Sequence, residues 1–195
     1  MANVCITQWA VEGGSESLAA IKAAYENLSA RTGGRERPGL ADFLTLLNIR
    51  IPKGTDLAAC IVDCTLPDKP GEALTMTTEE DWDPKIEAMM LLREPLNVTI
   101  YYNAEGFEDD IYLSNDTGRK HFKDAYALDF ETFFAEEADP VNYFETEKQL
   151  LDFVDTTFGV KLSSADEVGT DLEEILMDMG DENAFVSLHV KSDTD

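Results

Sequence analysis

The sequence predicts an α+β fold: a ferredoxin-like antiparallel sheet with helices on one face, extended by a β-meander and a C-terminal helix–helix–strand segment. Three observations predict this class. Apolar and polar residues alternate over residues 3–11 and again over 96–130, as they do in strands. Other apolar stretches have helical spacing and are bounded by capping residues or glycine. The resulting order of strand, helix, strand, strand, helix and strand is the ferredoxin-like pattern.

The N-terminal part is expected to contain one strand and two helices. Residues 3–11 alternate as a strand and are followed by a Gly-Gly break. Apolar residues then recur with helical spacing, which predicts a helix that ends near Gly33. These residues are Leu18, Ile21, Tyr25 and Leu28. A shorter apolar repeat over 40–47 predicts a second, short helix.

The middle of the chain is expected to add two strands and another helix. The apolar stretch 58–66 is compatible with a strand or with a short helix, and 73–78 is expected to be a strand. Asp83 followed by Pro84 is a typical helix start, because aspartate caps free N–H groups and proline suits the first helical position. We expect Trp82, directly before this cap, to pack on the sheet and fix the angle at which the helix enters.

A three-stranded meander is expected over residues 96–130. Its first apolar row is Leu96, Val98, Ile100 and Tyr102. Turn signals at 103–106 and 115–118 separate this row from a second one that includes Ile111 and from a third one over 126–130. A sheet of this kind needs a helical layer on its apolar face.

Two helices and a final strand are expected near the C-terminus. Thr146 and Gln149 have the spacing of a capping box, and Ser164 with Glu167, or Thr170 with Glu173, marks the start of a further helix. Residues 184–190 alternate as a strand.

The chain therefore divides into two predicted parts. Residues 1–130 form the ferredoxin-like core, and 131–195 form an acidic helical extension. Because 195 residues suit one domain or one domain with an extension, we expect the two parts to pack as one structural unit.

The chain is strongly acidic, with 40 Asp and Glu against 15 Lys and Arg and a formal net charge of −25. Residues 1–53 hold five acidic and six basic side chains, whereas 124–190 hold eighteen and two. Phosphate groups are bound by clustered Lys and Arg, so the charge argues against direct binding of nucleic acid and against an anionic membrane surface. With no membrane-length apolar segment and no visible signal peptide, we expect a cytoplasmic protein.

The helix expected near 165–179 carries the candidate partner-binding residues. They are Asp166, Glu167, Asp171, Glu173, Glu174 and Asp178. Carboxylates one helical turn apart recur about every 5–6 Å, which is close to the spacing of phosphates along a nucleic-acid strand. The helix face therefore either mimics DNA or is an ordinary solvated surface.

No residues stand in a spacing typical of a catalytic or metal site, so we expect no catalytic residue, metal or cofactor. His121 and His189 are far apart in the sequence rather than at i and i+4. Cys60 and Cys64 would lie about 13 Å apart on a strand, too far for a disulfide, so the cysteines are expected to be reduced. Four acidic residues near a turn match no calcium-binding loop: Glu105, Glu108, Asp109 and Asp110.

Three short stretches carry a family resemblance. The chain opens with Met-Ala-Asn-Val-Cys, Trp82 and Pro84 precede a helix, and the strand near Ile111 is followed by an Asn-Asp turn. These features resemble the Met-Ala/Pro-Asn-Trp-Cys opening, the Trp-x-Pro helix entry and the corresponding strand and turn of the Api92-like (YubB-type) ferredoxin-like family, although Val4 stands in place of its tryptophan. The resemblance covers residues 1–130. It implies a ferredoxin-like fold and a mobile-element context in phages, plasmids and gut bacteria, and it implies no activity.

Three hypotheses about function follow. The charge favours a non-enzymatic interaction protein whose residues 131–182 bind a basic protein surface, with a DNA-mimic inhibitor as the sharper form. The alternative is a small-molecule binder or enzyme with a cleft between the sheet and the C-terminal helices, in which His121 would meet Asp116 or Asp124. That alternative requires the space not to be filled by Phe133, Phe134, Phe144 and Phe158. The third hypothesis is an uncharacterised bacterial domain with no intrinsic activity.

Overall fold

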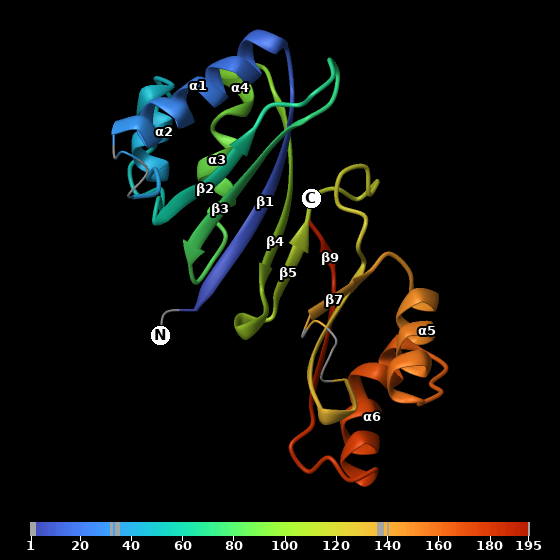
Figure 1. Ribbon diagram of the computed structural model, residues 1–195. Coiled ribbons are helices and arrows are strands. Elements are labelled where there is room, and N and C mark those ends of the chain that lie inside the picture. The colour runs from blue at the N-terminus through green and yellow to red at the C-terminus, as the bar shows by residue number, and fades with distance from the viewer. Residues whose placement is uncertain (1–2, 32, 34–35, 136–138, 140, 195) are drawn as a thin grey trace. The chain divides into compact units, whose positions relative to one another are not determined.

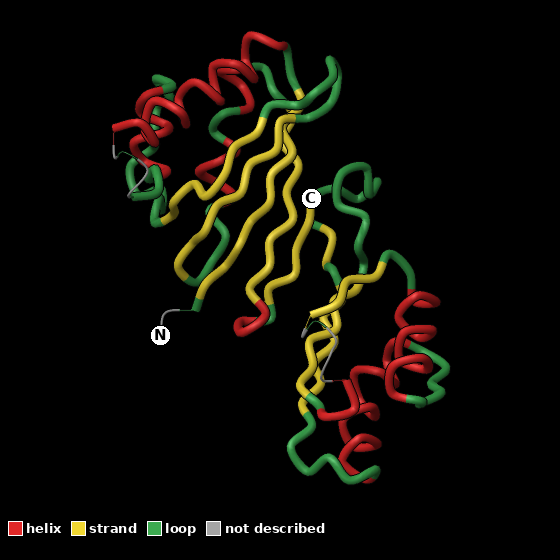
Figure 2. The backbone as a smooth tube through the Cα atoms, in the orientation of Figure 1, coloured by secondary structure: helices red, strands yellow, loops and turns green. Residues whose placement is uncertain are grey.

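The computed structural model describes residues 3–31, 33, 36–135, 139 and 141–194. They form two compact units, each with a sheet and helices of its own (Figures 1 and 2). The protein is therefore of the mixed α+β class that the sequence predicts. No helix within the described ranges is long and apolar enough to cross a membrane.

The first unit comprises Met1–Thr117 and Asp193–Asp195, and its sheet has the strand order β2-β3-β1-β4-β5-β9. The strands are β1 (Val4–Glu12), β2 (Ala59–Thr65), β3 (Leu74–Asp81), β4 (Thr99–Gly106), β5 (Ile111–Ser114) and β9 (Ser192–Asp193). The helices are α1 (Ser15–Arg31), α2 (Leu40–Leu46), α3 (Ile86–Met90) and α4 (Arg93–Leu96), with a 3-10 turn η1 (Phe107–Asp109). The stretch 58–66, for which the sequence allows two forms, contains a strand. The order of elements is β1, α1, α2, β2, β3, α3, α4 and β4, which does not conflict with the predicted ferredoxin-like pattern.

β1 is the central strand of this unit. It pairs antiparallel with β3 on one side, where Thr7 lies opposite Thr78, and with β4 on the other, where Trp9 lies opposite Tyr102. Alternate residues of β1 are buried: Cys5, Thr7, Trp9 and Val11. Val4 and Gln8, on the opposite face, are exposed. This period of two gives the sheet one face on which helices pack.

The helices cover that face. Ile21 of α1, Phe43 of α2 and Met89 of α3 belong to the same buried cluster as Trp9 and Tyr102 of the sheet (Figure 1). Complete burial of each large apolar side chain contributes about 1.5–3 kcal/mol. This shared core positions the loops and strand ends of the first unit.

The second unit, Gly118–Ser192, has a three-stranded sheet in the order β7-β6-β8. Its elements are β6 (Tyr126–Glu131), the 3-10 turn η2 (Phe133–Ala135), β7 (Val141–Phe144), α5 (Glu147–Phe158), α6 (Ala165–Asp178) and β8 (Phe185–Val190). Phe130 of β6 packs with Leu150 and Val154 of α5 and with Leu172 of α6 in a second buried cluster. Each unit therefore has its own core.

The predicted meander is wrong in its third strand. β4 and β5 form the expected hairpin, with Ala104 opposite Leu113, but residues 126–130 lie in β6 of the other sheet. The neighbour of β5 at this edge is β9, and the backbone N–H of Thr194 donates to the carbonyl of Ser114 at 2.8 Å. Eleven residues separate β5 from β6, whereas hairpin loops have roughly two to five residues. Alternation of apolar residues identifies a strand and its faces but does not identify its partner.

The division between the units also differs from the predicted one. It lies between Thr117 and Gly118 rather than after residue 130. As a result, β6 belongs to the three-stranded sheet of the second unit and not to the sheet of the first. The segment 131–195 does not stay together either, because β9 joins the sheet of the first unit.

α5 begins at the predicted Thr146 cap, and α6 begins after Ser164, the first of the two starts that the sequence allows. The Thr146 hydroxyl accepts a hydrogen bond from the Gln149 N–H at 3.3 Å, and the Gln149 side chain accepts one from the Thr146 N–H at 3.1 Å. The Ser164 hydroxyl accepts a hydrogen bond from the Glu167 N–H at 3.3 Å. Gly159 ends α5 with a φ of 72°, in the left-handed region that glycine tolerates best.

Replacement of Thr146 by alanine should lower the free energy of unfolding of the second unit by about 1 kcal/mol, because the capping box is lost. Thr156→Ala is the matched control, since Thr156 lies within the same helix and its hydroxyl bonds only the Asp152 carbonyl, at 2.7 Å. Amide hydrogen exchange across α5 measures both effects. Equal effects of the two substitutions would show that the capping box does not anchor the start of the helix.

Candidate functional site

All six predicted partner-binding residues lie on α6. Glu167, Asp171, Glu174 and Asp178 are spaced i, i+4, i+7 and i+11, so they follow one line along the helix. The apolar residues Val168, Leu172 and Leu176 are buried in the core of the unit, which leaves the acidic line away from the core.

Two of the six residues have structural roles. The Glu167 carboxylate accepts hydrogen bonds from the Ser163 N–H at 2.7 Å and from the Ser163 hydroxyl at 2.6 Å. These bonds lower the pKa of Glu167 below its usual value. The Glu173 carboxylate accepts a hydrogen bond from the Val186 N–H at 3.0 Å and so ties α6 to β8. Both carboxylates are therefore already used within the unit.

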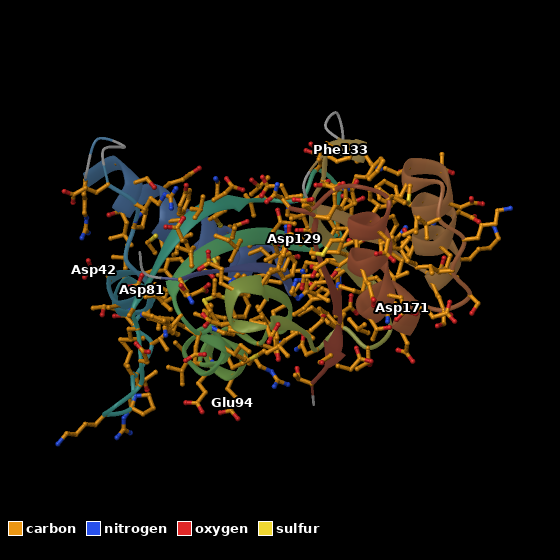
Figure 3. All side chains as sticks on the ribbon, turned by 90° about the horizontal axis from the view of Figure 1, so that it is seen from below. Asp42, Asp81, Glu94, Asp129, Phe133 and Asp171 are labelled. Carbon is orange, nitrogen blue, oxygen red and sulfur yellow. The ribbon has the colours of Figure 1, made fainter. Side chains whose placement is uncertain are left out.

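The other four are exposed: Asp166, Asp171, Glu174 and Asp178. Within the described part of the chain, the one hydrogen bond to a carboxylate of this set is from the Thr170 hydroxyl to Asp171, and no ion pair involves these carboxylates. Figure 3 labels the Asp171 side chain. α6 contains neither Lys nor Arg. The row from Asp171 to Asp178 spans seven residues, about 10 Å at 1.5 Å per residue.

α5 presents a different, mixed surface. Lys148 pairs with Asp152 at 2.7 Å, and Lys161 lines the same shallow cavity as Asp155. No basic residue thus interrupts the carboxylates of α6, whereas Lys148 on α5 and Lys161 in the segment after α5 lie close to carboxylates. The row of exposed carboxylates on α6 covers a shorter part of the chain than the acidic segment 131–182, which the sequence predicts as the binding surface.

The space between the sheet and the helices of the second unit is filled. Phe130, Phe144, Phe153 and Phe158 form a ring cluster, with centroids 5.2–6.0 Å apart. Of the four phenylalanines that would argue against the small-molecule hypothesis if they filled its cleft, Phe144 and Phe158 belong to this cluster, Phe134 is partly buried against it, and Phe133 is 51 % exposed. This aromatic packing lies within the second unit, and the cleft hypothesis stays a prediction.

A buried polar cluster lies between β1 and β3 in the first unit. The hydroxyls of Thr7 and Thr78 donate to the two oxygens of Glu80, the former at 3.1 Å, and the Trp9 indole N–H donates to the Thr78 hydroxyl at 2.7 Å. Glu80 is only 2 % exposed. Burial raises the pKa of the Glu80 carboxyl to about 7, against the opposing effects of the Thr78 and Thr7 hydrogen bonds and the positive charge of Lys85.

Other ionisable groups in this core include a buried lysine and two buried cysteines. Lys85 is buried and its ammonium group pairs with Asp56 at 2.7 Å. The hydrogen bond from Lys85 lowers the pKa of Asp56. Burial raises the pKa of Cys5 to about 12 and that of Cys64 to about 11. Both remain protonated thiols at neutral pH, and a thiol is a weak nucleophile.

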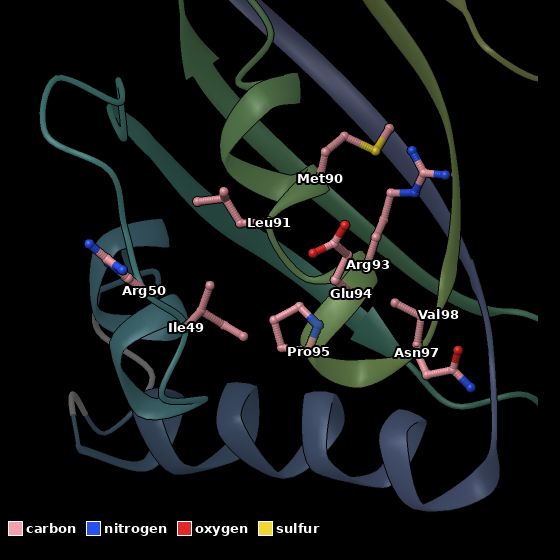
Figure 4. Close-up of a pocket in the computed structure, with 9 residues that line it drawn as sticks. All are labelled: Ile49, Arg50, Met90, Leu91, Arg93, Glu94, Pro95, Asn97 and Val98. Carbon is pink, nitrogen blue, oxygen red and sulfur yellow. The ribbon is translucent and has the colours of Figure 1, made fainter.

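A cavity of about 600 Å³ opens between the loop after α2 and the α3–α4 segment (Figure 4). Its walls include Ile49, Leu91 and Pro95, and it carries two arginines, Arg50 and Arg93. Figure 4 shows the two arginine side chains on opposite sides, extending in different directions, with the Glu94 carboxylate between them. Because these charges do not converge, the cavity lacks the focused polar groups of a small-molecule site.

Trp82 is the most unusual residue of the first unit. The sequence predicts that it packs on the sheet, but it is 54 % exposed and has a φ of 70°. An amino acid with a bulky side chain in this left-handed region costs roughly 1–2 kcal/mol. The predicted cap is also wrong: α3 begins at Ile86, and no side chain caps it. The Asp83 N–H instead bonds the Asp81 carbonyl at 3.0 Å, which turns the chain before the helix starts.

Comparisons with known proteins add no information on these sites. No protein-family model, curated protein or solved structure matches the chain.

Among the described residues, no group of three or more His, Cys, Asp or Glu is arranged to hold a metal ion. The acidic residues of the η1 turn include Asp109, whose carboxylate accepts two hydrogen bonds from the Asn3 amide.

Glu80 should make the stability of the first unit depend on pH. Its folded-state pKa of about 7 lies above the ordinary 4.5, so the stability that it contributes when protonated is complete below about pH 4.5 and is lost as the pH rises through 7. Relative to that of the Glu80→Gln variant, the free energy of unfolding of the wild type should fall by at most about 3 kcal/mol over this range. Urea unfolding followed by the fluorescence of the buried Trp9 measures the difference, with the exposed Glu108→Gln as control. If the difference in free energy of unfolding between the wild type and Glu80→Gln is constant from pH 4 to 8, Glu80 does not have a raised pKa.

Replacement of Trp82 by glycine should raise the free energy of unfolding by about 1 kcal/mol, because glycine adopts positive φ without strain. Asn97→Gly is the control: Asn97 has a φ of 50° and is exposed, but asparagine tolerates this conformation, so the gain should be smaller. Destabilisation by Trp82→Gly, measured by urea unfolding, would show instead that the indole stabilises the fold.

Proposed function

We propose that the protein is a non-enzymatic interaction protein whose second unit binds a basic protein surface through α6. The observation that carries this proposal is the exposed row of Asp171, Glu174 and Asp178 on a helix without a basic residue. Exposed carboxylates without ion-pair partners are free to pair with cations of another molecule.

The charge of the whole second unit supports the same conclusion. Residues 118–192 hold eighteen acidic and six basic side chains. Such an excess attracts a basic partner over distances of about 10 Å at 0.1 M salt and increases the association rate. It also repels nucleic acid and anionic lipid, so a protein is the partner class that the charge favours.

The geometry favours a compact basic patch over a long DNA-like interface. The row of Asp171, Glu174 and Asp178 extends over about two helical turns. Lys148 of α5 and Lys161 after it add basic groups elsewhere in the unit. A DNA-mimic inhibitor from a mobile element, in line with the Api92-like resemblance, is the sharper form of the proposal. It would need carboxylates outside α6 to extend the row.

Binding of fluorescein-labelled octa-arginine, followed by fluorescence anisotropy, tests the proposal. Asp171→Asn/Glu174→Gln/Asp178→Asn should weaken binding about tenfold at low salt, since each exposed ion pair contributes about 0.2–1 kcal/mol. Wild-type affinity should also fall as salt is raised.

The matched control removes three exposed charges from the first unit: Asp42→Asn/Asp68→Asn/Glu94→Gln. It changes the net charge equally but leaves α6 intact, so it should weaken binding by less than about twofold. Equal losses in the two triple variants would show that only net charge matters, and binding that ignores salt would contradict the electrostatic basis.

A further inference from the structure

A second exposed surface lies at one end of the sheet of the first unit. Trp82 is 54 % exposed and Val4 is 49 % exposed. Val4 lies opposite Asp81 in the β1–β3 ladder, one residue before Trp82. Isolated exposed apolar residues are common, but here the tryptophan directly follows the residue that pairs with the valine across β1 and β3.

Backbone and side-chain hydrogen bonds hold this end of the sheet in place. The Trp82 N–H donates to the Asn3 carbonyl at 3.0 Å, which extends the β1–β3 ladder to the tryptophan. The Asn3 amide donates to both oxygens of Asp109, at 3.0 and 3.1 Å. Three segments far apart in the sequence therefore meet here. We call Val4, Asp81, Trp82, Asp83 and Asp109 the Trp82 surface.

Two carboxylates flank Trp82 in the chain. Asp81 and Asp83 are exposed, and among the described residues no hydrogen bond or ion pair to their carboxylates is formed, although the Lys85 ammonium donates to the Asp81 carbonyl at 3.3 Å. Asp83 also lines a cavity of about 440 Å³ together with Asp56, Lys85 and Glu87. The one basic group in that lining, Lys85, is already paired with Asp56. The cavity therefore keeps an excess of negative charge.

We infer that the Trp82 surface and the adjoining cavity dock a protein segment that presents an arginine or a lysine next to an apolar residue. The face of an indole attracts a guanidinium or ammonium group, and the neighbouring carboxylates pair with the same cation. The apolar residue of the segment would cover Val4. Tryptophan at the centre of a patch with a charged rim is a typical energetic centre of a protein interface.

This inference extends the proposed function, since it depends on a basic partner but uses another surface in the other unit. Charge complementarity selects the occupant: an acidic segment or a nucleic acid would meet Asp81, Asp83 and Asp109 with like charge. The positive φ of Trp82 is strained. Such strain is typical of functional positions, where a side chain contacts another molecule instead of packing in the core.

Tryptophan fluorescence tests the inference directly, because Trp9 is 1 % exposed and Trp82 is the accessible indole. Octa-arginine should reduce acrylamide quenching of the wild-type protein. Trp82→Ala should weaken peptide binding about fivefold, whereas Trp82→Phe, which keeps an aromatic face, should weaken it by less than about twofold. Phe133→Ala removes an equally exposed aromatic ring from the second unit and should have no effect.

The α6 triple variant separates this inference from the proposed function. If it keeps the octa-arginine protection of Trp82, the Trp82 surface binds on its own, as inferred. If Trp82→Ala binds like the wild type, or the peptide leaves acrylamide quenching unchanged, the inference is wrong, although loss of binding in the α6 variant would still support the proposed function. Unchanged Trp9 fluorescence in Trp82→Ala confirms that the variant is folded.

Discussion

The two-sided pairing of β1 is the constraint on which the first unit depends. The strand must match β3 and β4 at once, and only one register places Cys5, Thr7, Trp9 and Val11 on the face that the helices cover. A shift of one residue would expose Trp9 and bury Gln8. The same register fixes the end of β3, because the ladder continues to the Trp82 N–H.

This constraint explains why polar groups lie inside the core. At Thr7, Thr78 and Glu80 the inward face of the sheet carries polar residues rather than apolar ones, and they satisfy one another with hydrogen bonds that include the Trp9 indole. Buried carboxylates are costly when ionised, so the cluster is most favourable with Glu80 protonated. The exposed carboxylates of α6 show the opposite arrangement: they stay in water, where a partner can reach them.

Local signals in the sequence predicted local structure well. The Thr146 and Ser164 caps and the alternation in β1 depend on neighbours within a few residues, and such signals are visible in the chain itself. The six acidic residues lie on a helix, as the sequence predicts, but their partner-binding role stays a prediction. The hydrogen bonds that occupy Glu167 and Glu173 come from the turn before the helix and from β8. The partners of a strand come from distant parts of the chain, so the prediction that β6 pairs in the sheet of β4 and β5 was wrong.

The Trp82 surface and the Glu80 cluster show the same limit of local signals. Asp83 and Pro84 form a standard cap sequence, yet the Asp81–Asp83 turn delays α3 and leaves Trp82 outside the core. In β3 the alternation of Leu74, Met76, Thr78 and Glu80 marks an inward face, and this pattern could have indicated the buried glutamate. Its hydrogen-bond partners come from β1, more than seventy residues earlier in the chain.

The central claim is that the protein binds basic protein segments through defined acidic surfaces rather than through its net charge. The most direct test is a titration of the ¹⁵N-labelled protein with octa-arginine, with amide chemical shifts followed at low and high salt. The account predicts shifts that cluster at 171–178 on α6 and around Trp82, and that decrease as salt is raised. Shifts of equal size over all acidic residues of both units, or none at these two surfaces, would contradict it.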